Sequence, residues 1–164
     1  MYTFKFSYTN DKEATVSFAH TFSNDRVTAK INLFKVDKET GKAVPQGDAT
    51  LKGAVYGLYA REDIVHPDGA TGVIYKAGEQ VASLTTDDKG QASVDGLYLG
   101  KYYVKEITPP TGYLADTEEH DLECSYEGDM TAEVKRECIS SEQVIKQPFQ
   151  IIKAANNGKT DADL

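Results

Sequence analysis

Residues 101–113 read KYYVKEITPPTGY, the most informative stretch of the sequence for the fold. Side chains of a β-strand point alternately to opposite faces, so Tyr102, Val104 and Glu106 share one face of a strand predicted over residues 100–107. The two prolines that follow end this strand and fix a tight connection. The stretch therefore predicts a strand that carries a carboxylate on its apolar face.

The rest of the chain alternates short runs rich in Val, Ile, Tyr, Phe and Thr with clusters of Gly, Asp, Asn and Pro. This pattern is typical of strands joined by turns. The predicted strands cover residues 2–8, 15–22, 29–37, 55–60, 73–76, 80–85, 92–97, 100–107, 118–125, 131–139 and 144–153. Only residues 62–65 offer a short helical turn. Many short, closely spaced strands predict an all-β sandwich or barrel.

Composition limits the function. The chain has 164 residues, enough for one full domain, and a net charge of −8, which argues against nucleic-acid binding because that needs clustered Lys and Arg. No apolar stretch approaches the length of a membrane span, and no secretory signal is visible at the N-terminus. We therefore expect no membrane insertion and, if the protein works outside the cell, a fragment of a longer precursor.

Cysteines and histidines suggest no metal or cofactor site. Cys124 and Cys138 lack CxxC spacing, so a zinc site is not predicted. If residues 127–129 turn a hairpin, Cys124 faces Ala132 instead of Cys138. Two free, half-buried thiols are therefore favoured over a disulfide. The three histidines, His20, His66 and His120, share no ligand spacing.

An internal repeat organises the chain. A shift of 118 residues aligns the N-terminal segment with the C-terminal one without a gap. The matched pairs are Ser7 with Ser125, Tyr8 with Tyr126, Asp11 with Asp129, Ala14 with Ala132, Val16 with Val134, Ser23 with Ser141 and Lys35 with Lys153. We expect a complete module at residues 29–145, the last hairpin of a preceding repeat at residues 1–28, and the first strand of a following repeat at residues 146–164.

Alternation also places a lysine in the core. Ile31, Leu33 and Lys35 share one strand face, which predicts that Lys35 points inward, as Glu106 does. Phe34 and Val36 on the opposite face leave the alternative open, and strand lysines usually point to solvent. Burial lowers the pKa of a lysine and raises that of a glutamate. A neutral amine is a nucleophile and a protonated carboxyl can move protons, so the pair could cross-link Lys35 to a side-chain carboxamide.

The segments FKVDKETGK, GAVYGLY, LTTDDKG and LYLGKYYVKEITPPTGY resemble, in this order, the Cna B-type or SpaA-like domain of Gram-positive pilins and adhesin stalks. The resemblance covers about residues 31–113, and Y-x-V-x-E-x-x-x-P-x-G-Y, from Tyr102 to Tyr113, is its most specific part. It implies an all-β, immunoglobulin-like (prealbumin-like) β-sandwich, to which the terminal repeats would add strands. GKTDADL at the C-terminus is similar to the opening of a further module.

The resemblance also implies a cross-link. In that family a first-strand Lys joins a last-strand Asn or Asp with the help of a Glu, and Lys35 and Glu106 match the Lys and the Glu. The repeat places Asn24 at the acceptor position of the preceding module, and Glu142 is its counterpart in the complete module. Three readings stay open: no cross-link in the central module, a shifted register, or Asn24 as acceptor through another strand arrangement. Lys153 is the equivalent lysine of the following repeat.

The function favoured by the sequence is a structural spacer in a bacterial surface stalk, with neighbouring repeats of the same polypeptide as partners. The alternative is a ligand-binding adhesin domain that contacts host protein or glycan, for which residues 61–79, with HPDGATG at their centre, form the longest irregular insertion. No constellation supports an enzyme with an external substrate, so any chemistry would be single-turnover, autocatalytic isopeptide formation. We expect an extracellular protein, attached to the cell wall through parts outside this chain.

Overall fold

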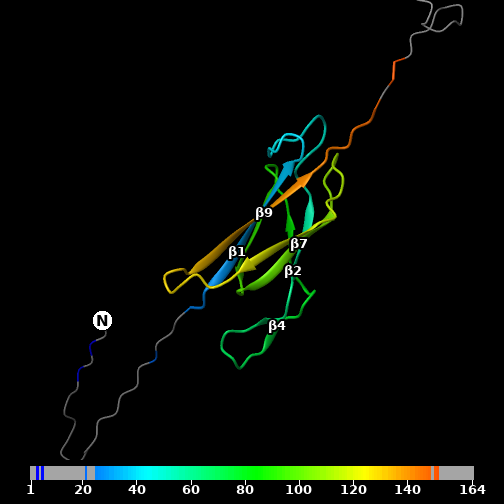
Figure 1. The fold of residues 1–164 in the computed structure, drawn as a ribbon. Helices are drawn as coiled ribbons and strands as arrows, with labels where there is room; N and C mark the ends of the chain where they lie inside the picture. The colour runs from blue at the N-terminus through cyan, green and yellow to red at the C-terminus, as the bar shows by residue number, and fades with distance from the viewer. Residues whose placement is uncertain (1–2, 4, 6–20, 22–24, 149, 152–164) are drawn as a thin grey trace, which may run out of the picture.

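The computed structural model describes residues 3, 5, 21, 25–148 and 150–151. In this part of the chain the elements are strands (Figure 1): β1 (Thr28–Asp37), β2 (Val55–Ala60), β3 (Ile64–Val65), β4 (Val73–Tyr75), β5 (Gln80–Thr85), β6 (Gln91–Leu97), β7 (Gly100–Thr108), β8 (Glu119–Cys124) and β9 (Glu133–Glu142). The expected all-β sandwich is confirmed.

Two sheets enclose the core. One has the order β6-β1-β9 and the other the order β5-β2-β7-β8, while β3 and β4 pair in a small separate hairpin. Within the first sheet β1 runs parallel to β9, with Lys35 opposite Ser140 and Asp37 opposite Glu142. Because the two strands are parallel neighbours, the start of β1 and the end of β9 lie at opposite ends of the module (Figure 1).

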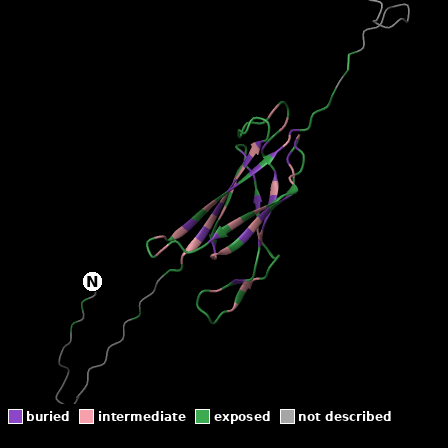
Figure 2. Cartoon of the chain, viewed as in Figure 1, coloured by how far each residue is buried: buried purple, intermediate pink, exposed green. Residues whose placement is uncertain are grey.

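The core follows from strand alternation. In β1 every second residue is buried, from Ala29 to Asp37, and in β7 the buried positions are Tyr102, Val104 and Glu106. These faces meet the inward side chains of β2 and β9 in one apolar cluster. Figure 2 shows buried positions distributed along the strands of both sheets. The alternation that fills this core also carries Lys35 and Glu106 into it, as predicted.

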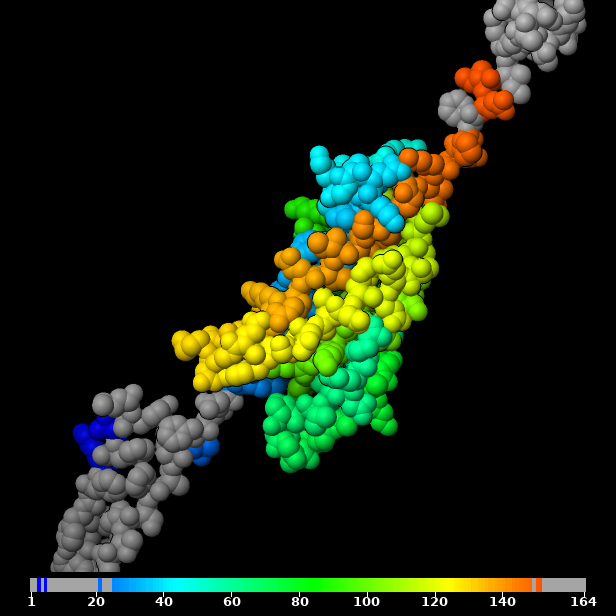
Figure 3. All heavy atoms as spheres, in the orientation of Figure 1, coloured from blue at the N-terminus to red at the C-terminus, as the bar shows by residue number. Residues whose placement is uncertain are grey.

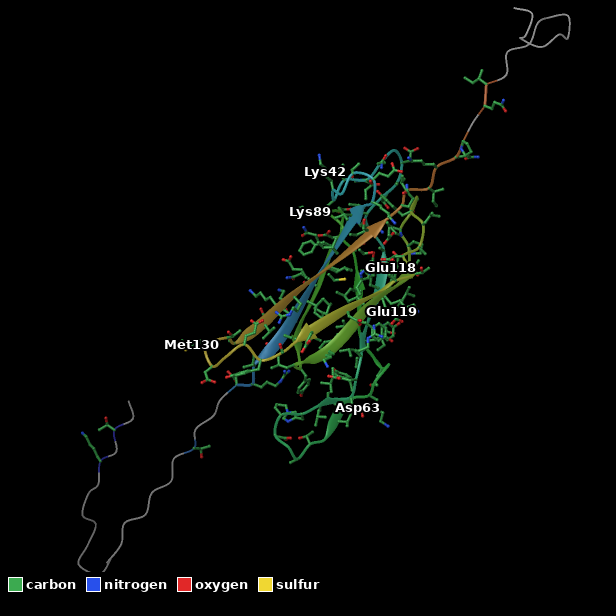
Figure 4. All side chains as sticks on the ribbon, in the orientation of Figure 1. Lys42, Asp63, Lys89, Glu118, Glu119 and Met130 are labelled. Carbon is green, nitrogen blue, oxygen red and sulfur yellow. The ribbon has the colours of Figure 1, made fainter. Side chains whose placement is uncertain are left out.

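Most of the predicted strands lie within two or three residues of those observed, and three differences have physical reasons. Residues 62–65, expected as a helical turn, include β3, which pairs with β4. The connection at residues 127–129 is not a hairpin, because β8 and β9 belong to different sheets. Met130, which is 98% exposed, lies in this crossover (Figure 4).

The third difference is at the C-terminal end. There Val144 makes only an isolated bridge with Tyr113, and the described residues beyond it form no strand. Of the strands predicted over residues 2–8 and 15–22, only residues 3, 5 and 21 are described, so these strands are not tested and the division into three repeats stays a prediction.

The two thiols are free, as favoured from the sequence, but they are more deeply buried than expected. Cys124 is fully buried and Cys138 is 3% exposed. Burial raises the pKa of Cys138 to about 12 and also raises that of Cys124. Both therefore remain protonated and act as small apolar core side chains.

A glycine holds β1 in place beside the core lysine. The Gly90 carbonyl accepts a hydrogen bond from the Lys35 amide at 2.7 Å. Gly90 has φ +71°, and a Cβ there would lie 2.8 Å from the Lys35 carbonyl oxygen and 3.2 Å from Leu51. Gly69 has φ +70° but open space around it, so it provides a matched control.

We predict that Gly69→Ala lowers the free energy of unfolding by about 1 kcal/mol, the strain of a left-handed non-glycine residue. Gly90→Ala should lower it by about 2–4 kcal/mol, because overpacking against backbone adds about 1–3 kcal/mol. Urea denaturation of both variants measures this. Equal effects of the two substitutions would contradict the close packing of Gly90 against β1.

Candidate functional site

Lys35 is the centre of the candidate site. It lies near the end of β1, is fully buried, and is held between β6 and β9 by the sheet hydrogen bonds of β1. Burial lowers its pKa from 10.5 to about 8, against the opposite effect of the carboxylates of Glu106 and Asp116. A minor fraction of Lys35 is therefore neutral near physiological pH, far more than for an exposed lysine, and this neutral amine is a usable nucleophile.

Two buried carboxylates converge on this amine. Lys35 Nζ lies 3.9 Å from Glu106 Oε1 on β7 and forms an ion pair with Glu142 Oε2 at the end of β9. Glu106 is 8% exposed and Glu142 is 2% exposed. Burial raises the pKa of Glu106, although the Asp116 amide and the charge of Lys35 oppose this. The elevated pKa suits Glu106 to gain and release a proton.

Three buried polar atoms lack a hydrogen-bond partner among the described residues, and all three belong to this site: Lys35 Nζ, Glu106 Oε1 and Glu142 Oε2. The Lys35–Glu142 contact is thus close in distance but is not a well-formed hydrogen bond. A buried ion pair without this compensation is costly. The unsatisfied atoms are thus the amine of Lys35, one oxygen of Glu142, its nearest carboxylate, and one oxygen of Glu106.

The remaining carboxylate oxygens are well bound. Glu106 Oε2 accepts a hydrogen bond from the Asp116 amide at 2.7 Å, and Glu142 Oε1 accepts one from the Tyr56 hydroxyl at 2.7 Å. The Tyr113 ring, whose centroid lies 4.9 Å from Lys35 Nζ, closes another side. These contacts fix each carboxyl group so that its unsatisfied oxygen lies toward the amine.

A series of hydrogen-bonded polar side chains connects the buried groups to the surface. Ser140 Oγ lies 2.9 Å from Asp116 Oδ2, which is also 2.7 Å from His120 Nε2. Burial acts to raise the pKa of Asp116, but hydrogen bonds from the Glu118 amide, His120 and Ser140 hold this pKa below its ordinary value. These residues, except Ser140, line a cavity of about 540 Å³ that Glu142 also borders. The site therefore has a polar route to solvent.

The structure brings together Lys35, Glu106 and Glu142 of the residues proposed from the sequence. Asn24 and Lys153 lie outside the described residues. Sequence reasoning missed Tyr56, Ser140 and Asp116. Ser140 lies opposite Lys35 only through the long-range parallel pairing of β1 with β9, so no local pattern marks it.

Within the described part of the chain, no group of three or more His, Cys, Asp or Glu side chains is placed to hold a metal ion. His66 lies apart from the site and packs edge-on against Tyr98. Among the described residues, no helix is long and apolar enough to cross a membrane.

The architecture defines a class: a β-sandwich whose first and last strands are parallel neighbours and enclose a lysine between two carboxylates. The chain belongs to the SpaA family of prealbumin-like fold domains, whose family model matches residues 29–137. The resemblance noted from the sequence is thus confirmed. Domains of this family have a structural fold of the pilin and adhesin type.

Solved structures that match part of the chain include several pilins. The TIE protein of Bacillus anthracis is 25% identical, with a TM-score of 0.47 over 73% of this chain and 18% of that one. A minor pilin of Streptococcus agalactiae is 23% identical, with a TM-score of 0.47 over 76% of this chain and 48% of that one. The major pilin subunit of Bacillus cereus, BcpA, is 22% identical, with a TM-score of 0.43 over 68% of this chain and 28% of that one.

The chain spans less than half the length of each of these three proteins. No curated protein matches it in sequence.

We predict that Glu142→Ala lowers the free energy of unfolding by about 3–5 kcal/mol, because it removes the nearest partner of a fully buried amine. The control is Asp88→Ala, which removes the partner of Lys52 in an ion pair whose side chains are 64% and 80% exposed. Such exposed pairs contribute little. Chemical denaturation compares the two, and a Glu142→Ala variant as stable as Asp88→Ala would contradict the assigned site.

Proposed function

We propose that this chain is a stalk module of a Gram-positive surface protein of the pilin or adhesin type, whose role is to provide length and mechanical strength. The observation that carries the proposal is the parallel pairing of β1 with β9. The chain enters the elongated module at one end and leaves it at the opposite end (Figure 3), so modules joined in series form an extended rod. Membership of the SpaA family supports the same role.

In this proposal the neighbouring partners are further modules of the same polypeptide. Residues 1–28 would close a preceding repeat and residues 146–164 would open a following one, as the 118-residue repeat suggests. The protein would be extracellular and attached to the cell wall through segments outside this chain.

The module is further proposed to carry an intramolecular amide bond between Lys35 and Glu142. The Lys35 amine would attack Cδ of the Glu142 carboxyl group, a C–N bond would form, and the C–Oε2 bond would break. One water molecule would leave, made from Oε2, the carboxyl proton and one proton of the amine. Glu106, whose Oε1 lies 3.9 Å from Lys35 Nζ, would take the proton from nitrogen and deliver it to the departing oxygen.

A Glu acceptor is a departure from the Asn or Asp that the resemblance implies. Two observations support it here. Glu142 occupies the position that the repeat aligns with Asn24. Its backbone lies opposite Asp37, two residues beyond Lys35, so the longer glutamate side chain spans the offset and contacts the amine. The balance of atoms needs no further reactant.

The bond would change how the module bears force. Tension entering at the start of β1 would pass through Lys35 to Glu142 and leave through the end of β9, and residues 36–141 would bear none of it. As a covalent closure of a loop of about 100 residues, it would also stabilise the fold by roughly 4–5 kcal/mol. Both effects suit a stalk.

One observation favours the alternative, a ligand-binding adhesin domain. A hollow of about 280 Å³ lies between the insertion at residues 61–79 and the start of the module, lined in part by Val65, Pro67, Tyr98 and Tyr126. Its mostly apolar lining suits a side chain of a host extracellular protein better than a glycan.

We predict that the intact mass of the purified chain is lower than the mass calculated from its sequence by one water molecule. Lys35→Ala and Glu142→Ala should restore the calculated mass, whereas Lys30→Ala, on the half-buried face of the same strand, should not. Glu142→Gln should lose ammonia instead of water and reach the same final mass as the wild type. High-resolution mass spectrometry with peptide mapping measures this, and an unshifted wild-type mass would overturn the cross-link.

The adhesin alternative predicts saturable binding to at least one protein in a panel of purified extracellular matrix proteins, measured by interferometry. Val65→Asp, which places a charge in the hollow, should weaken that binding at least tenfold. Val44→Asp is the control, because Val44 is similarly exposed but lies outside the hollow. Absence of binding to every protein in the panel favours the spacer function alone.

A further inference from the structure

We propose that the Tyr56 hydroxyl, assisted by Ser140, stabilises the oxyanion that forms on Glu142 when Lys35 attacks it. The inference rests on the proposed Lys35–Glu142 bond and adds two residues to its chemistry. Both side chains are fully buried and contact the reacting carboxyl group itself. They come from different sheets, because Tyr56 lies on β2 and Ser140 lies on β9.

The two oxygens of Glu142 have different surroundings. Oε2 is in contact with the Lys35 amine and has no hydrogen-bond donor of good geometry. Oε1 is 2.7 Å from the Tyr56 hydroxyl and 3.2 Å from Ser140 Oγ. The oxygen in contact with the nucleophile is thus the one suited to leave, and the other is suited to hold negative charge.

The supply of hydrogen atoms makes Tyr56 the main donor. Its hydroxyl is closer to Glu142 Oε1, at 2.7 Å, than to Ser140 Oγ, at 3.1 Å. Burial raises the pKa of Tyr56 above its ordinary value, so the hydroxyl keeps its proton. Ser140 has a single hydrogen, for which Asp116 Oδ2 competes at 2.9 Å. Ser140 therefore contributes less in the ground state, and its hydrogen can turn to Oε1 as charge develops there.

The chemistry follows from this asymmetry. When Nζ of neutral Lys35 bonds to Cδ of the protonated carboxyl group, the C=O electron pair moves onto Oε1 and the Tyr56 donor meets the new charge. Glu106 takes a proton from Nζ and returns it to Oε2, which leaves as water while the C=O bond re-forms. The product is an amide whose oxygen is still bound by Tyr56. Donors already fixed where charge will develop need no reorganisation during the reaction.

Asp116 and His120 are positioning residues in this scheme. Asp116 holds Ser140 through Oδ2 and holds Glu106 through its amide, so it fixes groups on both sides of the reacting carbon. His120 in turn binds the same Asp116 oxygen at 2.7 Å. Neither contacts the reacting atoms in the described structure.

The test measures the rate of bond formation in newly made full-length chain. Protein is synthesised in a pulse of cell-free translation and samples are quenched in denaturant at increasing times. Intact mass then gives the fraction linked, and protease resistance of parallel samples gives the fraction folded. We expect Tyr56→Phe, which keeps the ring, to fold like the wild type but to link about 100- to 1,000-fold more slowly, the effect of removing one oxyanion donor.

Matched variants separate this role from a structural one. Tyr103→Phe removes a hydroxyl from a half-buried tyrosine stacked on Tyr59 and should link at the wild-type rate. Ser140→Ala should slow linking less than Tyr56→Phe, and Ser140→Thr, which keeps a hydroxyl, should restore part of the rate. If Tyr56→Phe does not become protease-resistant, the linking rates of Ser140→Ala and Ser140→Thr decide whether the buried hydroxyls stabilise the oxyanion.

The outcomes also separate this inference from the proposed cross-link. A wild-type chain that never loses water overturns the bond and the oxyanion role together. A wild-type chain that links, with Tyr56→Phe and Ser140→Ala linking as fast as Tyr103→Phe, overturns only the role of the two hydroxyls. If linking lags behind folding in Tyr56→Phe but not in Tyr103→Phe, the result supports the oxyanion role of the hydroxyls.

Discussion

The burial of one lysine between two carboxylates is the interaction on which the rest of the structure depends. An uncompensated ammonium in the core is strongly unfavourable, so Lys35 requires Glu106 and Glu142 within reach. These three residues come from β1, β7 and β9, and therefore from both sheets. The sandwich must close in one register for the charges to meet. The close approach of Gly90 to β1 and the parallel pairing of β1 with β9 both serve that register.

The parallel pairing of β1 with β9 explains why a stalk is the proposed function. Parallel first and last strands send the chain in at one end and out at the other, so load crosses the β1–β9 pair in shear. Lys35 and Glu142 lie near the ends of these strands, which is where a covalent bond would relieve the hydrogen bonds of the rest of the module. In the proposed function, stability and mechanical strength would thus have a common origin in one buried contact, and the hydroxyl of Tyr56 would take part in its chemistry.

Much of this could be predicted from the sequence because strand alternation is local. The period-two patterns around Lys35 and Glu106 placed both side chains inward, and the family motif ending in Tyr113 gave the fold. The strand pairing is not local, and this explains the differences. Nothing near residues 127–129 reveals that β8 and β9 lie in different sheets. Tyr56 lies in VYGLYA, where Tyr56, Gly57 and Leu58 are all buried, so alternation does not single it out. The repeat aligned Glu142 with Asn24, but only the fold brings it to Lys35.

An atomic-resolution crystal structure of the wild-type chain would show whether Lys35 and Glu142 are covalently joined. We predict continuous electron density from Lys35 Nζ to Glu142 Cδ at amide geometry, with Oε2 gone and the remaining oxygen within hydrogen-bond distance of the Tyr56 hydroxyl. Density for a complete Glu142 carboxylate, with both oxygens present and the Lys35 amine at hydrogen-bond distance from one of them, would contradict it. The site would then be a buried ion pair with no covalent bond.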